Sequence, residues 1–177
     1  QTLEAGIETA VDHLPRFVPI ESVERRPLVF TQLQSEGRQN PATSRIIKVS
    51  GDGFQILVQE AEVSRGISAP KTLHWVVVSP SASDSSHFKF WSGLGQVSSN
   101  PTTLHFGENL AEMPRVFAGV QSLNQVDTVT VRATDVKSSK ITVYLEEEQT
   151  FDKETVHGKE NVAWFATRGR KIFASND

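Results

Sequence analysis

Hydrophobic and polar residues alternate along much of the chain, the pattern of strands that have one covered face. The clearest case is the segment 54–60, in which Phe54, Ile56 and Val58 fall on one side. Other short segments are rich in β-branched and aromatic residues, and no stretch of ten residues shows helical periodicity. The strands expected are 3–7, 28–33, 43–49, 54–60, 72–78, 87–91, 102–106, 116–120, 126–133, 140–147 and 162–167. The pattern therefore predicts an all-β protein.

Turn-forming residues separate the expected strands. Gly51 and Gly53 indicate a tight hairpin between the segments 43–49 and 54–60. The prolines within 13–20 argue against a helix there. The Ser-rich run that ends at Ser86 is the one low-complexity stretch, and it is typical of a linker.

The sequence contains an internal duplication. Pro114-Arg-Val-Phe-Ala-Gly-Val-Gln-Ser122 repeats Pro27-Leu-Val-Phe-Thr-Gln-Leu-Gln-Ser35 at an offset of 114 − 27 = 87 residues. After a gain of two residues, Trp164 falls on Trp75, at 164 − 75 = 89. A constant offset over several hydrophobic positions is what a duplicated structural unit leaves behind. We therefore predict a degenerate first repeat at 1–80, a linker at 81–86 and a second repeat at 87–177.

The same offsets place individual positions of the two repeats on each other. Arg132 falls on Arg45 and Glu147 on Glu60, both 87 residues apart. At the start of the repeats, we expect Gly95 to match Gly6 at an offset of 95 − 6 = 89.

Composition excludes several classes of function. The net charge is −3, and there is no basic stretch of the kind that binds nucleic acid. The absence of cysteine excludes disulfides, thiol nucleophiles and cysteine-based zinc sites. No apolar run reaches 18 residues, so membrane insertion is not expected. The chain begins at Gln1, and we interpret it as a processed or excised piece of a longer protein.

The second repeat carries a longer set of motifs. After Pro114–Ser122 come Ile141-Thr-Val-Tyr-Leu-Glu-Glu-Glu148, then His157-Gly-Lys-Glu160 and Val162-Ala-Trp-Phe-Ala166. This set resembles the H-type lectin-like repeats of secreted or surface-attached bacterial proteins. The resemblance implies a six-stranded antiparallel β-sandwich in each repeat, with the two tandem repeats packed together. It also implies metal-free binding of galactose-type sugars, assembly into homo-oligomers with sugars near subunit contacts, and location outside the cell or at its surface.

No catalytic motif is present. The chain lacks a Gly-x-Ser-x-Gly elbow, a His-Glu-x-x-His zinc motif, a phosphate-binding loop and a dinucleotide fingerprint. A glycosidase needs two carboxyl groups across a cleft. Alternation instead sends Glu146 and Glu148 to one face of their strand and Glu147 to the other, which is also the pattern of a solvated strand end. We predict that the protein is not an enzyme.

The residues His157 and Glu160 have two interpretations. They precede a strand in a loop with Gly158, and their planar polar groups suit paired hydrogen bonds to vicinal sugar hydroxyls. Alternatively, they brace the loop by a hydrogen bond between imidazole and carboxylate. Two such residues without a third ligand nearby are a weak indication of a metal site. The first repeat has Ser68-Ala-Pro-Lys71 where the second has His157-Gly-Lys-Glu160.

Arginines and aromatic residues complete the set of candidates. Arg45 and Arg132 are favoured as clamps on the carboxylates of Glu60 or Glu147, with sugar contact as the alternative. Alternation places Trp91 opposite Phe88 and Phe90 and hence toward solvent, where it would stack on a sugar ring or cover the seam between the repeats. Trp75 and Trp164 lie in apolar segments and are expected in the core. Tyr144 and Phe151 are further candidates for stacking.

Together with these candidate residues, the resemblance predicts a non-catalytic carbohydrate-binding protein, with galactose-type sugars or galactan as the favoured ligand. It would form part of a larger secreted or surface protein, with a glycan and neighbouring domains or further copies as partners. The alternative is a structural or adhesive spacer without a sugar ligand. The predicted ligand-binding residues are Trp91, Arg132, His157, Glu160, Tyr144, Glu147 and Arg45, with no catalytic residue, metal or cofactor.

Overall fold

The computed structural model describes residues 3–21, 26–34, 41–61, 69–79, 90–149 and 153–167. All regular secondary structure within these ranges is β-strand, which confirms the predicted all-β class. Within the same ranges, no helix is long and apolar enough to cross a membrane. The Ser-rich linker predicted at 81–86 lies outside the described residues, as does Phe151.

The first half of the chain forms two three-stranded antiparallel sheets. One sheet has the order β1-β6-β3 and the other the order β2-β5-β4. The strands are β1 (Leu3–Val11), β2 (Arg16–Pro19), β3 (Leu28–Gln34), β4 (Ala42–Ser50), β5 (Gly53–Glu60) and β6 (Lys71–Val78). The two sheets enclose a hydrophobic core that includes Phe54, Ile56, Leu73 and Trp75. This half is therefore a six-stranded β-sandwich.

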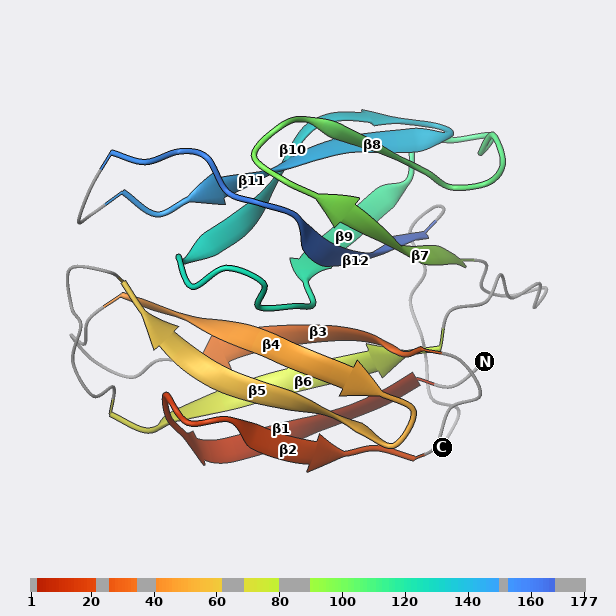
Figure 1. Ribbon diagram of the computed structural model, residues 1–177. Helices are drawn as coiled ribbons and strands as arrows, with labels where there is room; N and C mark the ends of the chain where they lie inside the picture. Colours follow the sequence, from red (N-terminus) through yellow and green to blue (C-terminus); the bar gives the residue numbers. More distant parts are fainter. Residues whose placement is uncertain are drawn as a thin grey trace.

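The second half has the same topology. Its sheets have the orders β7-β12-β9 and β8-β11-β10, and they lie above the first sandwich in Figure 1. The strands are β7 (Phe90–Val97), β8 (Thr102–His105), β9 (Arg115–Val120), β10 (Val129–Lys137), β11 (Lys140–Glu147) and β12 (Glu160–Thr167). Its core includes Trp91, Val143, Leu145 and Trp164. Each strand of one half thus has a counterpart six places later in the other, as a duplication requires.

Irregularities of the strands also repeat. The register between β4 and β5 shifts between Ile46 and Lys48, and that between β10 and β11 shifts between Ala133 and Asp135. Both bulge positions are separated by 87 residues, which is the offset of the sequence repeat. A β-bulge bends its strand and is a specified feature of a fold rather than a defect.

Two glycines make room for the core tryptophans, and they correct the predicted alignment at the start of the repeats. Gly6 lies opposite Trp75, and Gly93 lies opposite Trp164. The structural counterpart of Gly6 is therefore Gly93, at 93 − 6 = 87, and the predicted match with Gly95 was wrong. A Cβ added at Gly6 would lie 2.3 Å from the Trp75 ring, and one at Gly93 would lie 2.7 Å from the Trp164 ring.

Replacing either glycine by alanine is expected to destabilise the protein. Both changes, Gly6→Ala and Gly93→Ala, force a buried indole to move, and overpacking of this kind costs about 1–3 kcal/mol. Gly107→Ala serves as a matched test of backbone strain alone, because that glycine has a φ of 87° and nothing within 4 Å of the added carbon. Urea denaturation of the three variants measures the effect. Wild-type stability in Gly6→Ala and Gly93→Ala would contradict the tight indole contact.

The short strand β2 was not predicted. Among the strands of the described residues it pairs with β5 only and lies at the edge of its sheet, and Pro19 is its last residue. Proline lacks the N–H group needed to pair on both sides, so it is tolerated at an edge but obscures the sequence pattern.

A hydrophobic cluster joins β3 and β6 of the first sandwich to β7 and β12 of the second, and β3 and β4 lie on the side of the first sandwich that faces the second (Figure 1). The buried residues between them are Leu28, Val78, Phe90 and Ala163. At this contact the Phe165 ring lies 5.4 Å from the Phe30 ring, edge to face. The outer faces of these strands are therefore partly covered by the other repeat, which explains why so many strand positions are apolar on both sides.

Candidate functional site

The predicted ligand-binding residues lie in three separate places. Trp91 belongs to the core of the second sandwich, and Arg132 and Tyr144 lie on its outer sheet β8-β11-β10. The other four are buried together between the repeats: Arg45, Glu147, His157 and Glu160. They do not form one solvent-exposed site.

The predicted exposure of Trp91 was wrong. Its side chain is 5% exposed, and its indole N–H donates a hydrogen bond to Glu108. Trp91 packs in the core of the second sandwich, whereas its neighbour Phe90 points toward the first repeat. Alternation along the strand was correctly assigned, but the outer face of β7 is the one that the other repeat covers. Trp91 therefore lies in the core and Phe90 on the outer face, the reverse of the prediction.

Arg132 and Tyr144 face solvent on neighbouring strands. They lie opposite each other in the register of β10 and β11, and Arg132 forms an exposed ion pair with Glu146. Glu147, the next residue of β11, is buried on the other face, as the alternation predicts. Exposed pairs of this kind contribute little to stability.

Glu160 is the centre of the buried polar network between the repeats. Its carboxylate accepts hydrogen bonds from the Ser122 hydroxyl, from the backbone N–H of Asn124 at 2.9 and 3.0 Å, and from that of Gln125 at 3.2 Å. His157 Nε2 lies 3.3 Å from Glu160 Oε1. Burial by itself raises the pKa of Glu160, but these hydrogen bonds outweigh it, so the pKa lies below the ordinary value.

Arg45 reaches into this network from the first repeat. Its Nη2 donates to Glu160 Oε1 at 3.2 Å and to the Ser122 carbonyl at 3.3 Å, and its Nη1 donates to the Asp127 carbonyl at 3.2 Å. Burial lowers the pKa of Arg45, and the charges of Glu160 and Asp127 oppose that shift. The guanidinium stays charged, because an arginine pKa begins so far above neutrality.

The predicted partners of the two arginines were therefore wrong. Arg45 pairs with Glu160 of the other repeat, rather than with Glu60 or Glu147, and Arg132 pairs with Glu146. The equivalent arginines have different roles because the repeats contact each other through different surfaces.

Uncharged side chains reinforce the same contact. Gln121 accepts a hydrogen bond from the Val29 N–H at 3.0 Å and donates one to the Pro27 carbonyl at 2.8 Å. The Thr128 hydroxyl donates to the Glu60 carbonyl at 3.3 Å. The segment 121–128 of the second repeat thus lies against β3, β4 and β5 of the first repeat. The hydrogen bond between His157 and Glu160 matches the loop-bracing role considered for them in the sequence.

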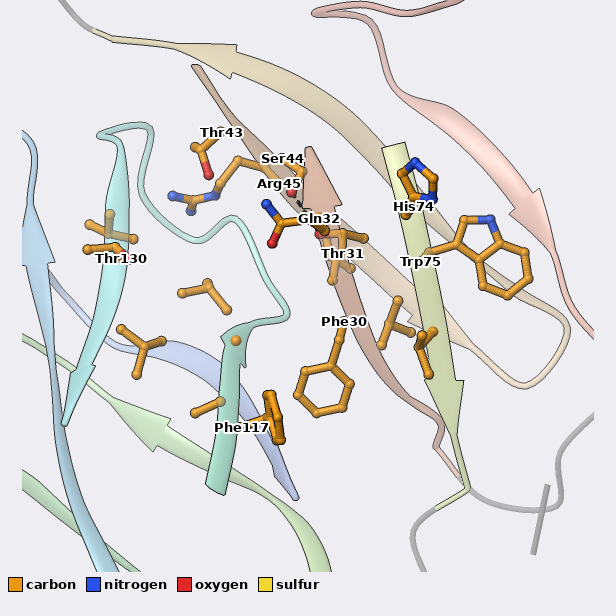
Figure 2. A pocket seen from close by; sticks show the side chains of 18 residues that line it. Phe30, Thr31, Gln32, Thr43, Ser44, Arg45, His74, Trp75, Phe117 and Thr130 are labelled. Carbon is orange, nitrogen blue, oxygen red and sulfur yellow. Dashed lines mark hydrogen bonds between the residues drawn. The ribbon is translucent and has the colours of Figure 1, made fainter. Parts of the chain in front are cut away.

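A groove of about 450 Å³ opens between the two sandwiches beside this network (Figure 2). Phe117 lies in it with 56% of its surface exposed, and its ring stacks on Phe165 at 4.8 Å with 10° between the planes. The hydroxyls of Thr31 and Ser44 share a hydrogen bond of 2.8 Å in the groove. The described residues that line it contribute hydroxyl, amide, imidazole and guanidinium groups but no carboxylate.

Sequence reasoning missed the residues of the groove, although the duplication contained a signal. Phe30 and Phe117 both line it and occupy equivalent positions, at 117 − 30 = 87. Thr43 and Thr130 form a second such pair, at 130 − 43 = 87. The repeated Pro-x-Val-Phe motif therefore marks the aromatic residues of the groove, but only the packing of the repeats shows that they meet.

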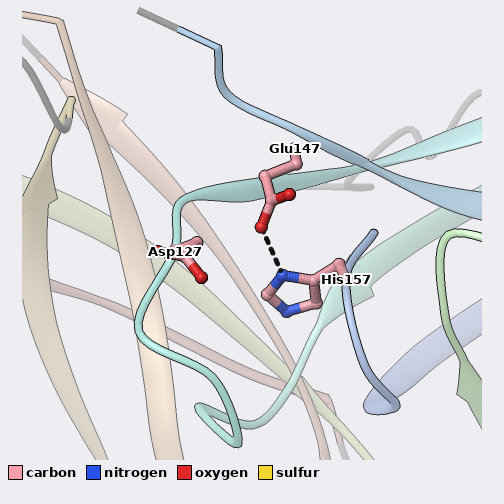
Figure 3. Close-up of side chains that lie close together, drawn as sticks. All are labelled: Asp127, Glu147 and His157. Atoms are coloured by element: carbon pink, nitrogen blue, oxygen red, sulfur yellow. Dashed lines mark hydrogen bonds and ion pairs between the residues drawn. The ribbon is translucent and has the colours of Figure 1, made fainter. Parts of the chain in front are cut away.

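Three buried or half-buried residues have the chemistry of metal ligands. Asp127, Glu147 and His157 each offer one ligand atom, and these atoms lie within 4.8 Å of one another (Figure 3). Sequence spacing did not indicate Asp127, which lies 30 residues before His157.

Comparison with known proteins gives no match. No family model fits the chain, and neither the curated proteins nor the solved structures include a significant similarity.

Proposed function

We propose that this protein binds carbohydrate without cleaving it, in the groove between its two sandwiches, with galactose-type sugars or galactan as the ligand class. The observation that carries the proposal is the exposed Phe117 ring at a groove lined by hydroxyl and amide groups. Aromatic rings stack on the apolar face of a pyranose, and a few polar groups then fix its orientation. The resemblance of 114–166 to H-type lectin-like repeats supports the sugar class and a role within a secreted or surface protein.

The chemistry of the groove favours binding over hydrolysis. Glycoside hydrolysis needs a pair of carboxyl groups on either side of the bond that is cleaved. Among the described lining residues, the only ionisable side chains are Arg45 and His74, and His74 Nε2 lies 2.8 Å from Gln34 Oε1. A sugar held against Phe117 would therefore meet hydrogen-bonding groups and no acid–base pair.

Replacing Phe117 by alanine is expected to weaken binding to galactan or a galactose-terminated glycan at least about tenfold, through loss of the stacking contact. Phe17→Ala is the matched control, since Phe17 is 49% exposed on β2, away from the groove. A glycan array followed by affinity electrophoresis in galactan measures both variants. Full binding by Phe117→Ala would place the site elsewhere, and no binding by the unmodified chain in either format would contradict the proposed function.

A structural or adhesive spacer is the second candidate. The observation that favours it is the burial of four polar residues: Arg45 and Glu160 join the two repeats, and Glu147 and His157 are hydrogen-bonded within the second repeat. If the protein is a spacer, the unmodified chain binds no glycan, and substitutions in this network change only its stability.

A further inference from the structure

We propose that Asp127, Glu147 and His157 bind one divalent transition-metal ion, for which Zn²⁺ is the best-matched candidate. The three side chains converge from the segment before β10, the end of β11 and the loop before β12 (Figure 3). One imidazole and two carboxylates form a nitrogen and oxygen ligand set that suits Zn²⁺, with water at the fourth position. None of the three lines the groove, so this site is independent of the proposed carbohydrate site.

The buried Glu147 carboxylate is only partly hydrogen-bonded within the described residues. The Glu147 side chain is 3% exposed, and its Oε1 lies 3.1 Å from His157 Nδ1. Its Oε2 is buried and has no hydrogen-bond partner among the described residues. A buried carboxylate oxygen without a partner is costly, and native structures satisfy such groups with protein, water or an ion. In Figure 3 Oε1 is the oxygen nearer Asp127 and His157, so a cation in the cluster would satisfy Oε2 when the Glu147 carboxylate binds it through both oxygens.

The hydrogen bonds of His157 prepare its other nitrogen for a metal. Nε2 lies 3.3 Å from Glu160 Oε1 and can donate its proton there. With an ion in the cluster, Nδ1 would give up its hydrogen bond to Glu147 Oε1 and offer its lone pair to the metal. A carboxylate that holds the far nitrogen of a histidine ligand fixes its tautomer and orientation. Glu160 is itself held by Ser122, Asn124 and Arg45.

The charges of the cluster match a divalent cation. With His157 neutral, the carboxylates of Asp127, Glu147 and Glu160 and the guanidinium of Arg45 sum to −3 + 1 = −2. One divalent ion would bring this group to neutrality. Asp127 is half-buried, so one of the three ligands remains partly accessible to solvent.

The first repeat offers a reason for a single site. Glu60 stands at the position of Glu147, but Ser68 stands where the second repeat has His157, at 157 − 68 = 89. The nitrogen ligand is therefore absent from the corresponding place. We expect a stoichiometry of one ion per chain.

Titration of the chelator-treated chain with Zn²⁺ at neutral pH tests the proposal, by calorimetry and by a thermal shift. We expect one equivalent to bind and the melting temperature to rise. Asp127→Asn should weaken Zn²⁺ binding at least about tenfold, and Glu160→Gln, which acts through the His157 orientation, about 10–100-fold. Asp135→Asn is the matched control, because Asp135 lies on β10 next to Lys137 and outside the cluster.

Two results would overturn the metal site. One is a chelator-treated, folded chain that takes up no stoichiometric Zn²⁺. The other is equal affinity in the wild type and in Asp127→Asn, which would show that the ion binds elsewhere. Asp127→Asn tests the metal site even if a His157 variant fails to fold, because asparagine preserves the shape of the side chain. The substitution also keeps the bond from Arg45, which goes to the backbone carbonyl of Asp127.

Discussion

Replacing Arg45 by methionine is expected to lower the free energy of unfolding by about 3–5 kcal/mol, because it leaves the buried Glu160 carboxylate without its cation. The Arg45 side chain is 2% exposed, and that of Glu160 is 0% exposed. The same change removes the donors to the carbonyls of Ser122 and Asp127. Urea denaturation of the full chain, followed by tryptophan fluorescence, measures the loss.

The duplication provides the matched control for this experiment. Arg132 is the equivalent residue of the second repeat, but its side chain is 56% exposed and pairs with Glu146 on the surface. Arg132→Met should therefore change stability by less than about 1 kcal/mol. Adding Glu160→Gln to Arg45→Met should recover part of the loss, since the uncompensated charge is then absent. Equal effects of the two arginine variants would show that the contact between the repeats does not depend on the buried pair.

The difference between the arginines follows from the way in which the repeats meet. Gln121 of the second repeat binds Pro27 and Val29 of the first, whereas its counterpart Gln34 lies against His74 of its own repeat. The contact is therefore heterologous, with a different surface contributed by each repeat. Only one arginine of the pair can be buried in such a contact. Lys71 stands at the position of Glu160, at 160 − 71 = 89, so the first repeat has no matching carboxylate to offer.

The strands were predictable where the signal is local. The alternation of 54–60 and 140–147 depends only on which face of a strand is covered, and both segments are strands with the expected faces buried. The constant offset of the duplication added the long-range information that both halves share one topology. Trp75 and Trp164 were correctly placed in the core for the same reason.

The candidate site was predictable only in part, because burial between the repeats is not encoded by periodicity. Of the two interpretations of His157, the loop brace matches its hydrogen bond to Glu160, three residues away. The partner of Arg45 lies 115 residues along the chain, and no pattern within either repeat indicates it. Likewise, the groove beside Phe117 exists only once both sandwiches are packed. Interactions across a packed contact depend on the relative placement of two folded units.

Trp91→Ala is expected to lower the free energy of unfolding by about 3–5 kcal/mol, the usual cost of truncating a buried tryptophan. The residue is 5% exposed and packs in the core of the second sandwich with Val97, Leu104 and Phe106. A surface platform for a sugar would behave differently, since its loss would reduce binding and leave stability unchanged. Thermal and urea unfolding of the variant measure the effect directly.

Phe117→Ala separates the two roles in the same assay. Its exposed ring makes a stacking contact with Phe165, so its removal should cost only about 1 kcal/mol of stability. Trp91→Ala should therefore impair folding, and Phe117→Ala should impair glycan binding in a chain that remains folded. The reverse pattern would return Trp91 to the ligand site and contradict the inward orientation of its side chain. This pair of aromatic residues thus tests the face assignment of β7 and the proposed function in a single comparison.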